Sequence, residues 1–320
     1  MTDTNNNNNN NSKLRVGVVG MGPVGCILAT YLIKAGVFTV VCDIRDNIID
    51  RIKKSGIRLT NVFTEKVKVP DAVYSIQELE MYELDLVIIS TKTPSLQKVV
   101  DRLAEIDNEK MFIMIAQNGI DNEQLAARRF GEERTLRMVV NFAGNLRDDH
   151  VVHVSFFNPP NYIAALLRHG EHIADELVSL FNAVGLESET PPDIQDYVWE
   201  KAILNAALSP VCAITRRTMK DVLDFPQGQE FVEAIIDESV RIAEAEGIEL
   251  GKKFRRFCIR YLKNAGHHRP SMLVDMEAGL PTEINYLNGR IVEYGRKHHI
   301  PAPLNMSVSQ IVRMLEKDQV

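Results

Sequence analysis

The sequence lacks the features that mark membrane-spanning, disulfide-rich and zinc-binding proteins. No apolar run in its 320 residues approaches the roughly 20 residues that span a bilayer, so no membrane association is expected. The four cysteines are scattered without a Cys-x-x-Cys pair. This predicts reduced thiols in a cytoplasmic protein rather than a disulfide framework or a zinc site.

The start of the chain lacks the cationic and apolar segments of a signal peptide. Met1-Thr2-Asp3-Thr4 is followed by an uninterrupted run of asparagines, Asn5–Asn11. Such a polar, low-complexity stretch cannot build a packed core. Residues 1–12 are therefore predicted to form a disordered polar tail outside the fold.

An excess of basic residues is also missing. The formal net charge of -6 and the isoelectric point near 5.8 give no reason to expect nucleic-acid binding. The adjacent pairs His267-His268 and His298-His299 do not share a helix face, so no metal site is predicted. With 45% hydrophobic and 25% charged residues the composition is that of a globular protein, and the length predicts two domains.

What the chain does contain is a glycine-rich turn between a strand and a helix. Gly20-Met21-Gly22-Pro23-Val24-Gly25 follows an apolar run at 14–19 and precedes a helical pattern at 26–32. Asp43 ends a second strand-like run at 38–42, at about the spacing expected for an acid that contacts a ribose. This arrangement is typical of a dinucleotide-binding site.

Each glycine of this turn has its own physical role. Gly20 allows the tight turn, Gly22 removes a Cβ where pyrophosphate approaches, and Gly25 lets the helix pack on the strand. Pro23 suits a first helical turn, where its missing N–H is not needed. The free N–H groups and the positive end of the helix dipole would hold the phosphates.

The rest of the chain divides into two patterns. Up to residue 190, strand-like and helical segments alternate, which predicts a doubly wound Rossmann sheet over 13–190. Pro191-Pro192 is the candidate linker, and 191–320 is predicted to be an all-helical substrate and catalytic domain. Predicted strands are 86–90, 111–115, 135–143, 151–156, 162–167 and 185–189, and predicted helices are 96–106, 171–184, 196–208, 230–245, 252–264, 284–297 and 306–317.

The helical segment 198–208 is apolar almost all round, which predicts a largely buried helix. Lys201, Asn205 and Ser209 nevertheless recur at every fourth position and form one polar strip. A lysine on a buried helix is costly unless it is paired or lines a wet site. The alternative is a lysine that extends to solvent beside two hydrogen-bonded core residues.

Two further groups of residues are candidates. Ser271 and Thr282 could each be the N-cap of a helix. Glu283 could favour a helix dipole or be the carboxylate that a buried Lys201 needs. Thr91, Lys92 and Asn118 follow two predicted parallel strands, whose carboxyl ends face the nucleotide in such sheets, although Asn118-Gly119 is also a turn signal.

Together these segments resemble the ketopantoate reductase (2-dehydropantoate 2-reductase) family over 14–316. The glycine-rich turn, Asn118-Gly119, Lys201 with Asn205, and Ser271 with Glu283 stand where that family has its motifs. The resemblance implies a Rossmann sheet followed by a helical domain, as in 6-phosphogluconate dehydrogenase. It also implies an NAD(P)H-dependent oxidoreductase that reduces a branched 2-keto acid, most simply 2-dehydropantoate in pantothenate biosynthesis.

The resemblance also implies roles for the candidate residues. Lys201 and Glu283 would be catalytic, with Lys201 donating the proton. The substrate would contact Asn118, Asn205, Ser209 and Ser271. The cofactor would contact Gly20, Met21, Gly22, Pro23, Val24, Gly25, Asp43, Arg45, Thr91, Lys92 and Asn118.

Two positions depart from the family pattern. Ser209 stands where a second asparagine is common, which leaves open another 2-keto acid or an opine-type substrate. Asp43 would accept hydrogen bonds from ribose hydroxyls and repel a 2′-phosphate, so NAD is favoured over NADP, although Arg45 could meet that phosphate. A non-catalytic NAD(H)-binding sensor is a further alternative, and the apolar helical half allows a homodimer.

Overall fold

The computed structural model describes residues 14–317. In it the chain forms two compact units. The tail predicted for residues 1–12 lies outside the described residues. The sheet unit comprises residues 14–91, 95–117 and 123–191. The helical unit comprises 192–317 together with two short segments, 92–94 and 118–122, which follow strands of the sheet unit in the chain. No sequence pattern indicates that these two segments belong to the helical unit.

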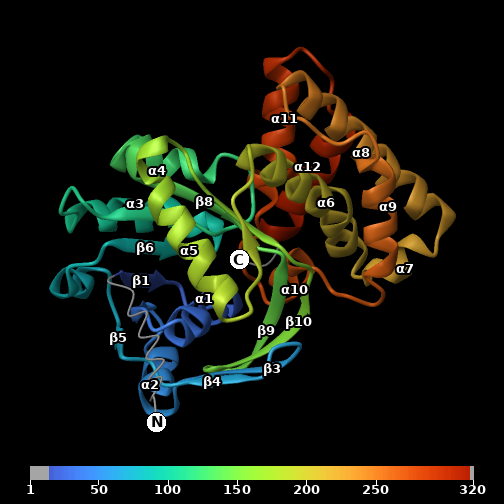
Figure 1. The fold of residues 1–320 in the computed structure, drawn as a ribbon. Helices are drawn as coiled ribbons and strands as arrows, with labels where there is room; N and C mark the ends of the chain where they lie inside the picture. Colours follow the sequence, from blue (N-terminus) through green and yellow to red (C-terminus); the bar gives the residue numbers. More distant parts are fainter. Residues whose placement is uncertain (1–13, 318–320) are drawn as a thin grey trace, which may run out of the picture. The chain divides into compact units, whose positions relative to one another are not determined.

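The sheet unit is built on an eight-stranded sheet with the order β12-β11-β8-β7-β6-β1-β2-β5. Figure 1 labels β1, β5, β6 and β8 of this sheet. All neighbouring strands are parallel except β11 and β8. The strands are β1 (Arg15–Val19), β2 (Phe38–Cys42), β5 (Asp71–Val73), β6 (Leu86–Ile89), β7 (Phe112–Ile115), β8 (Thr135–Val139), β11 (Asn161–Ala165) and β12 (Ser188–Glu189).

Both faces of this sheet are buried, which explains why its central strands are apolar throughout. In β6, Leu86 and Ile88 belong to the core on the side of α1 (Pro23–Lys34) and α5 (Glu171–Ala183). Val87 and Ile89 point to the other core, formed with α3 (Leu96–Glu105) and α4 (Asn122–Phe130). Successive side chains of β6 therefore pack against helices on opposite faces of the sheet.

A second sheet, with the order β4-β3-β10-β9, was not predicted. It consists of β3 (Ile57–Asn61), β4 (Glu65–Val67), β9 (Phe142–Asp148) and β10 (Val151–Phe157), and α2 (Asp46–Ser55) precedes it. The prediction of one strand over 135–143 is wrong, because β8 ends at Val139 and β9 begins in the other sheet. Pairing of β10 with β3 joins segments far apart in the chain and leaves no local signal.

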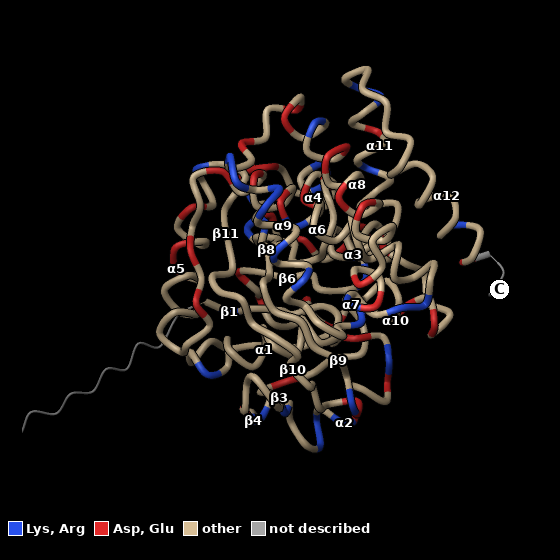
Figure 2. The backbone as a smooth tube through the Cα atoms, turned by 90° about the vertical axis from the view of Figure 1, so that its right-hand side faces the viewer, with Lys and Arg blue, Asp and Glu red and all other residues tan. Residues whose placement is uncertain are grey.

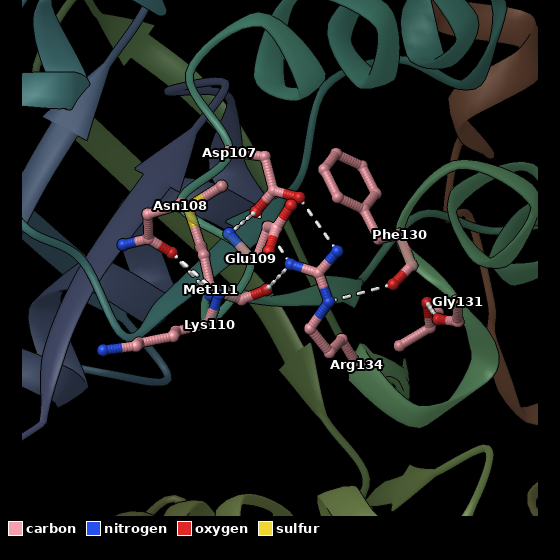
Figure 3. Close-up of polar contacts among 9 residues, drawn as sticks. Asp107, Asn108, Glu109, Lys110, Met111, Phe130, Gly131 and Arg134 are labelled. Atoms are coloured by element: carbon pink, nitrogen blue, oxygen red, sulfur yellow. Dashed lines mark hydrogen bonds and ion pairs between the residues drawn. The ribbon is translucent and has the colours of Figure 1, made fainter.

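Arg134 joins two connections of the sheet unit (Figure 3). Its guanidinium donates to both carboxylate oxygens of Asp107, at 2.8 and 2.9 Å, and to the carbonyl oxygens of Phe130 and Met111. The Asn108 side chain accepts a 2.9 Å hydrogen bond from the Met111 N–H. These contacts tie the loop between α3 and β7 to the end of α4, and so fix the position at which β7 enters the sheet.

The helical unit packs around α6 (Ile194–Thr215), most of whose side chains are buried. α6 contacts α7 (Met219–Leu223), α8 (Pro226–Ala245), α9 (Phe254–Asn264), α10 (Ser271–Glu277) and α12 (Pro303–Lys317). The helix predicted over 284–297 is split into a short 3-10 helix, Ile284–Tyr286, and α11 (Asn288–Lys297). The remaining 3-10 helices are Gln77–Tyr82, Thr93–Ser95, Glu132–Arg134 and Arg168–Gly170.

Charged residues of both signs occur along the whole described chain (Figure 2). Among the helices of residues 14–317, none combines the length and the apolar character needed to cross a membrane. The predicted α/β architecture followed by an all-helical part is confirmed.

Candidate functional site

The glycine-rich turn joins β1 to α1 in the sheet unit, as predicted. Gly20 has a φ of +96°, and a Cβ there would lie 2.7 Å from the backbone nitrogen of Thr91. A Cβ at Gly25 would overlap the carbonyl oxygen of Gly20. A Cβ at Gly22 would meet nothing within 4 Å. The first and third glycines are thus required by the fold, whereas the second leaves open space.

The N-terminus of α1 suits a negatively charged ligand. Gly22 is its N-cap and supplies no side chain, and Pro23 opens the first turn. The first-turn N–H groups of such a helix carry a partial positive charge, and here no acidic side chain of that turn competes for them. The open space over Gly22 and this helix end fit the pyrophosphate of a dinucleotide.

Asp43 follows β2 and reaches back to the same turn. Its side chain is 4% exposed, and its Oδ2 accepts a 2.7 Å hydrogen bond from the Met21 N–H. Arg45 donates to the same carboxylate through Nε, at 2.8 Å, and Nη2, at 2.7 Å. Burial raises the pKa of Asp43, but the hydrogen bonds from Arg45 and Met21 outweigh burial and hold it below its usual value. The carboxylate is therefore charged at neutral pH.

These glycines allow a matched pair of substitutions. Gly22→Ala should leave the thermal midpoint nearly unchanged and weaken dinucleotide binding roughly tenfold or more, because its methyl group occupies the ligand's space. Gly25→Ala should instead lower the thermal midpoint by several degrees, because helix and turn must separate. Calorimetry and NADH titration by fluorescence measure both effects. Equal dinucleotide affinity in Gly22→Ala and the wild type would contradict this assignment.

In the helical unit, α6 carries the predicted polar strip. Ser209 is buried, and Lys201 and Asn205 are half-buried, although the neighbouring Ala202 and Ala206 are fully in the core. α10, which begins with Ser271, packs against α6. The strip therefore lies along a helix that is otherwise largely buried, as the sequence predicts.

Segment 92–94 contacts two buried carboxylates of the helical unit. Lys92 Nζ lies 2.6 Å from Oδ2 of Asp275, whose side chain is only 7% exposed. Thr93 donates its hydroxyl to Oε1 of the buried Glu283 at 2.8 Å, and its N–H lies 3.4 Å from the same atom. Burial raises the pKa of Asp275; Lys92 opposes this increase, and the charge of Glu283 adds to it. The two carboxylates thus share one electrostatic environment.

The same segment holds the Asn118 loop. The Thr93 hydroxyl also lies 3.1 Å from the Asn118 carbonyl oxygen, which accepts a 2.7 Å hydrogen bond from the side chain of Asn122. The Ile120 N–H donates to the Tyr286 carbonyl oxygen, close to Glu283 in the chain. Within the helical unit the structure thus gathers Asn118, Thr93, Glu283 and their neighbours.

Asp275 was not among the predicted site residues, and neither N-cap candidate occupies the N-cap position of its helix. Asp275 stands one helical turn after Ser271, and this spacing was the available signal. Ser271 is exposed and is the first residue of α10, whose N-cap is Pro270, so it caps nothing. Thr282 precedes the 3-10 helix by two residues; its hydroxyl accepts a 3.3 Å hydrogen bond from the Ile284 N–H.

Fold and site together define a two-part dinucleotide-binding protein with a helical unit that carries a half-buried lysine. The family model of ketopantoate reductase PanE/ApbA matches residues 16–166, and that of its C-terminal part matches 193–316. The chain therefore belongs to the ketopantoate reductase family, and the resemblance seen in the sequence is confirmed.

Named relatives match nearly the whole chain. A protein of Archaeoglobus fulgidus named 2-dehydropantoate 2-reductase is 27% identical over 94% of this chain and 98% of its own. One of Aquifex aeolicus with the same name is 26% identical over 93% and 96%. The crystal structure of a PanE/ApbA family ketopantoate reductase from Ralstonia eutropha JMP134 is 25% identical, with a TM-score of 0.86, over 96% of this chain and 99% of that chain. D-mandelate dehydrogenase with NADH and anilino(oxo)acetate shares the fold, at 22% identity and a TM-score of 0.85 over 96% and 99%.

Proposed function

We propose that this protein reduces 2-dehydropantoate to pantoate with a reduced nicotinamide dinucleotide. The observation that carries the proposal is the buried Glu283, held by Thr93, in the same unit as the half-buried Lys201 of α6. A charged side chain that is withdrawn from water is costly unless it is paired or hydrogen-bonded, and such side chains are concentrated at catalytic sites. Relatives named 2-dehydropantoate 2-reductase that match over nearly the whole chain support the substrate.

The dinucleotide, when bound, supplies the hydride for the keto carbon. Negative charge then grows on the keto oxygen, and the ammonium group of Lys201 stabilises it and donates the proton. Glu283 pairs with Lys201 or accepts a hydrogen bond from the substrate hydroxyl. A positioned general acid of this kind increases the reaction rate by a factor of about 10²–10⁴.

Four polar side chains orient the substrate in this proposal. Asn205 and Ser209 lie on the strip of Lys201, and Ser271 opens the helix packed against it. Asn118, whose backbone is held by Thr93 and Asn122, contacts both substrate and nicotinamide ribose. Ser209 has a shorter side chain and fewer hydrogen-bonding atoms than an asparagine, so it leaves more space for the substrate at this position.

The proposed cofactor is NADH rather than NADPH. Asp43 is charged, buried and fixed to the glycine-rich turn by the Met21 N–H. Arg45 is bound to it, but the Arg45 side chain is 48% exposed and can leave when ribose hydroxyls take its place as donors. A 2′-phosphate at the same position would face the carboxylate. Thr91 and Lys92 belong to the proposed cofactor contacts, and the proposed setting is the cytoplasm, with a homodimer as a further prediction.

The substrate can be tested with three 2-keto acids. NADH oxidation at 340 nm should give a kcat/KM for 2-dehydropantoate at least about tenfold above that for 2-ketoisovalerate, which lacks the hydroxymethyl group of 2-dehydropantoate. Phenylglyoxylate, the keto acid related to mandelate, should be poorer still. A preference for either of the other two acids would reassign the substrate. Tight NADH binding without turnover of any acid would indicate a sensor.

A further inference from the structure

Helix α6, which carries Lys201, contains a proline in its interior. Pro210 is buried and lies well before the end of the helix at Thr215. Proline has no backbone N–H, so it cannot give the hydrogen bond that residue i+4 normally gives to the carbonyl of residue i. The carbonyl oxygen of Ala206 therefore loses its partner within the helix. A buried carbonyl without a partner is destabilising.

A side chain from another helix supplies the missing donor. The amide nitrogen of Asn288, the first residue of α11, lies 3.0 Å from the carbonyl oxygen of Ala206. Asn288 is fully buried, so water does not compete for this carbonyl. The bond therefore replaces the one that Pro210 removes.

A chain of hydrogen bonds sets the orientation of the Asn288 amide. Its nitrogen also donates to Oδ1 of Asn305 at 2.9 Å, and the nitrogen of Asn305 donates to Oε1 of the buried Glu238 at 2.8 Å. Glu238 is itself fixed by the N–H groups of Leu304 and Asn305 at the start of α12. Because a carboxylate only accepts, each amide in the chain must turn its nitrogen in one direction.

We propose that Asn288 is a positioning residue for the substrate-binding strip of α6. Ala206 directly follows Asn205, and Ser209 directly precedes Pro210, so the bond closes the helical turn between the two strip residues. Without it the turn can open, and the spacing of the two side chains is lost. This inference rests on the proposed function, in which Asn205 and Ser209 contact the keto acid.

A double-mutant cycle tests the replacement directly. Asn288→Leu keeps the size of the side chain and removes the donor. This variant should have a thermal midpoint roughly 4 °C lower than the wild type. Its KM for 2-dehydropantoate should rise roughly fivefold, and its KM for NADH should be unchanged. In a Pro210→Ala background the restored N–H serves Ala206, so the cost of Asn288→Leu in both quantities should fall to about half or less. Asn285→Leu, three residues earlier, is the control. The Asn285 side chain is exposed and accepts one hydrogen bond from Arg313, so this variant should lower the thermal midpoint by less than Asn288→Leu and leave the KM for 2-dehydropantoate unchanged.

The outcomes separate this inference from the proposed function. Equal costs of Asn288→Leu in both backgrounds, or a thermal cost with an unchanged KM for the keto acid, would overturn the positioning role. Absence of turnover in the wild type would overturn the proposed function alone, since the thermal cycle still decides the bond. If a variant does not fold, hydrogen exchange of the side-chain amides in the wild type decides it. The Asn288 amide should exchange at least about 100-fold more slowly than that of Asn285, and equal rates would overturn the inference.

Discussion

Lys201→Ala should lower kcat about 100-fold or more while leaving NADH affinity nearly unchanged. The ammonium group is the proposed proton donor, and loss of a positioned general acid removes about 10²–10⁴ in rate. The glycine-rich turn that would hold the pyrophosphate lies in the sheet unit, whereas Lys201 lies in the helical unit. Steady-state kinetics with 2-dehydropantoate and a fluorescence titration of NADH measure the two quantities.

Lys220→Ala is the matched control for this substitution. Lys220 is in the same unit, but its exposed side chain pairs with Asp224 on the surface of α7. Its removal should leave kcat unchanged, because exposed ion pairs contribute little. A Lys201→Ala enzyme with near wild-type kcat would mean that the polar strip of α6 is structural.

The wild-type enzyme should prefer NADH to NADPH by at least tenfold in kcat/KM. Two like charges about 4 Å apart at an effective dielectric near 20 repel by about 4 kcal/mol before relaxation, and tenfold requires only about 1.4 kcal/mol. Asp43→Asn should shrink this preference, because the repulsion disappears and Arg45 loses its carboxylate partner and is released toward the phosphate. The kcat/KM values for both cofactors in both proteins are the measurement.

Asp50→Asn is the control for Asp43→Asn, because it changes the net charge by the same amount. Asp50 is exposed on α2, where it accepts a hydrogen bond from the Tyr74 hydroxyl. Its replacement should leave the cofactor preference as it is in the wild type. A wild-type preference for NADPH would show that Arg45 dominates at this position and would contradict the assignment of NADH.

Local patterns were sufficient for the glycine-rich turn and for α6. The roles of Gly20 and Gly25 follow from their place between strand and helix, and the structure gives each a steric reason. The burial of α6 follows from its composition alone. In these places the information lies within a few residues of sequence.

Contacts between distant segments could not be predicted in this way. The pairing of β10 with β3 and the ion pair between Lys92 and Asp275 depend on how the chain folds back on itself. The same holds for Asn288. Its side chain donates to the Ala206 carbonyl oxygen on another helix, which has no backbone donor because residue 210 is proline. Such partners are chosen by tertiary packing, for which no short motif exists.

Formation of pantoate tests the proposed reductase activity directly. Purified protein, NADH and 2-dehydropantoate should yield one pantoate for each NADH oxidised, measured by absorbance at 340 nm and by mass spectrometry of the product. The Lys201→Ala variant in the same assay should form pantoate at least about 100-fold more slowly. NADH oxidation without pantoate, or no oxidation by a protein that binds NADH tightly, would contradict the proposed reductase.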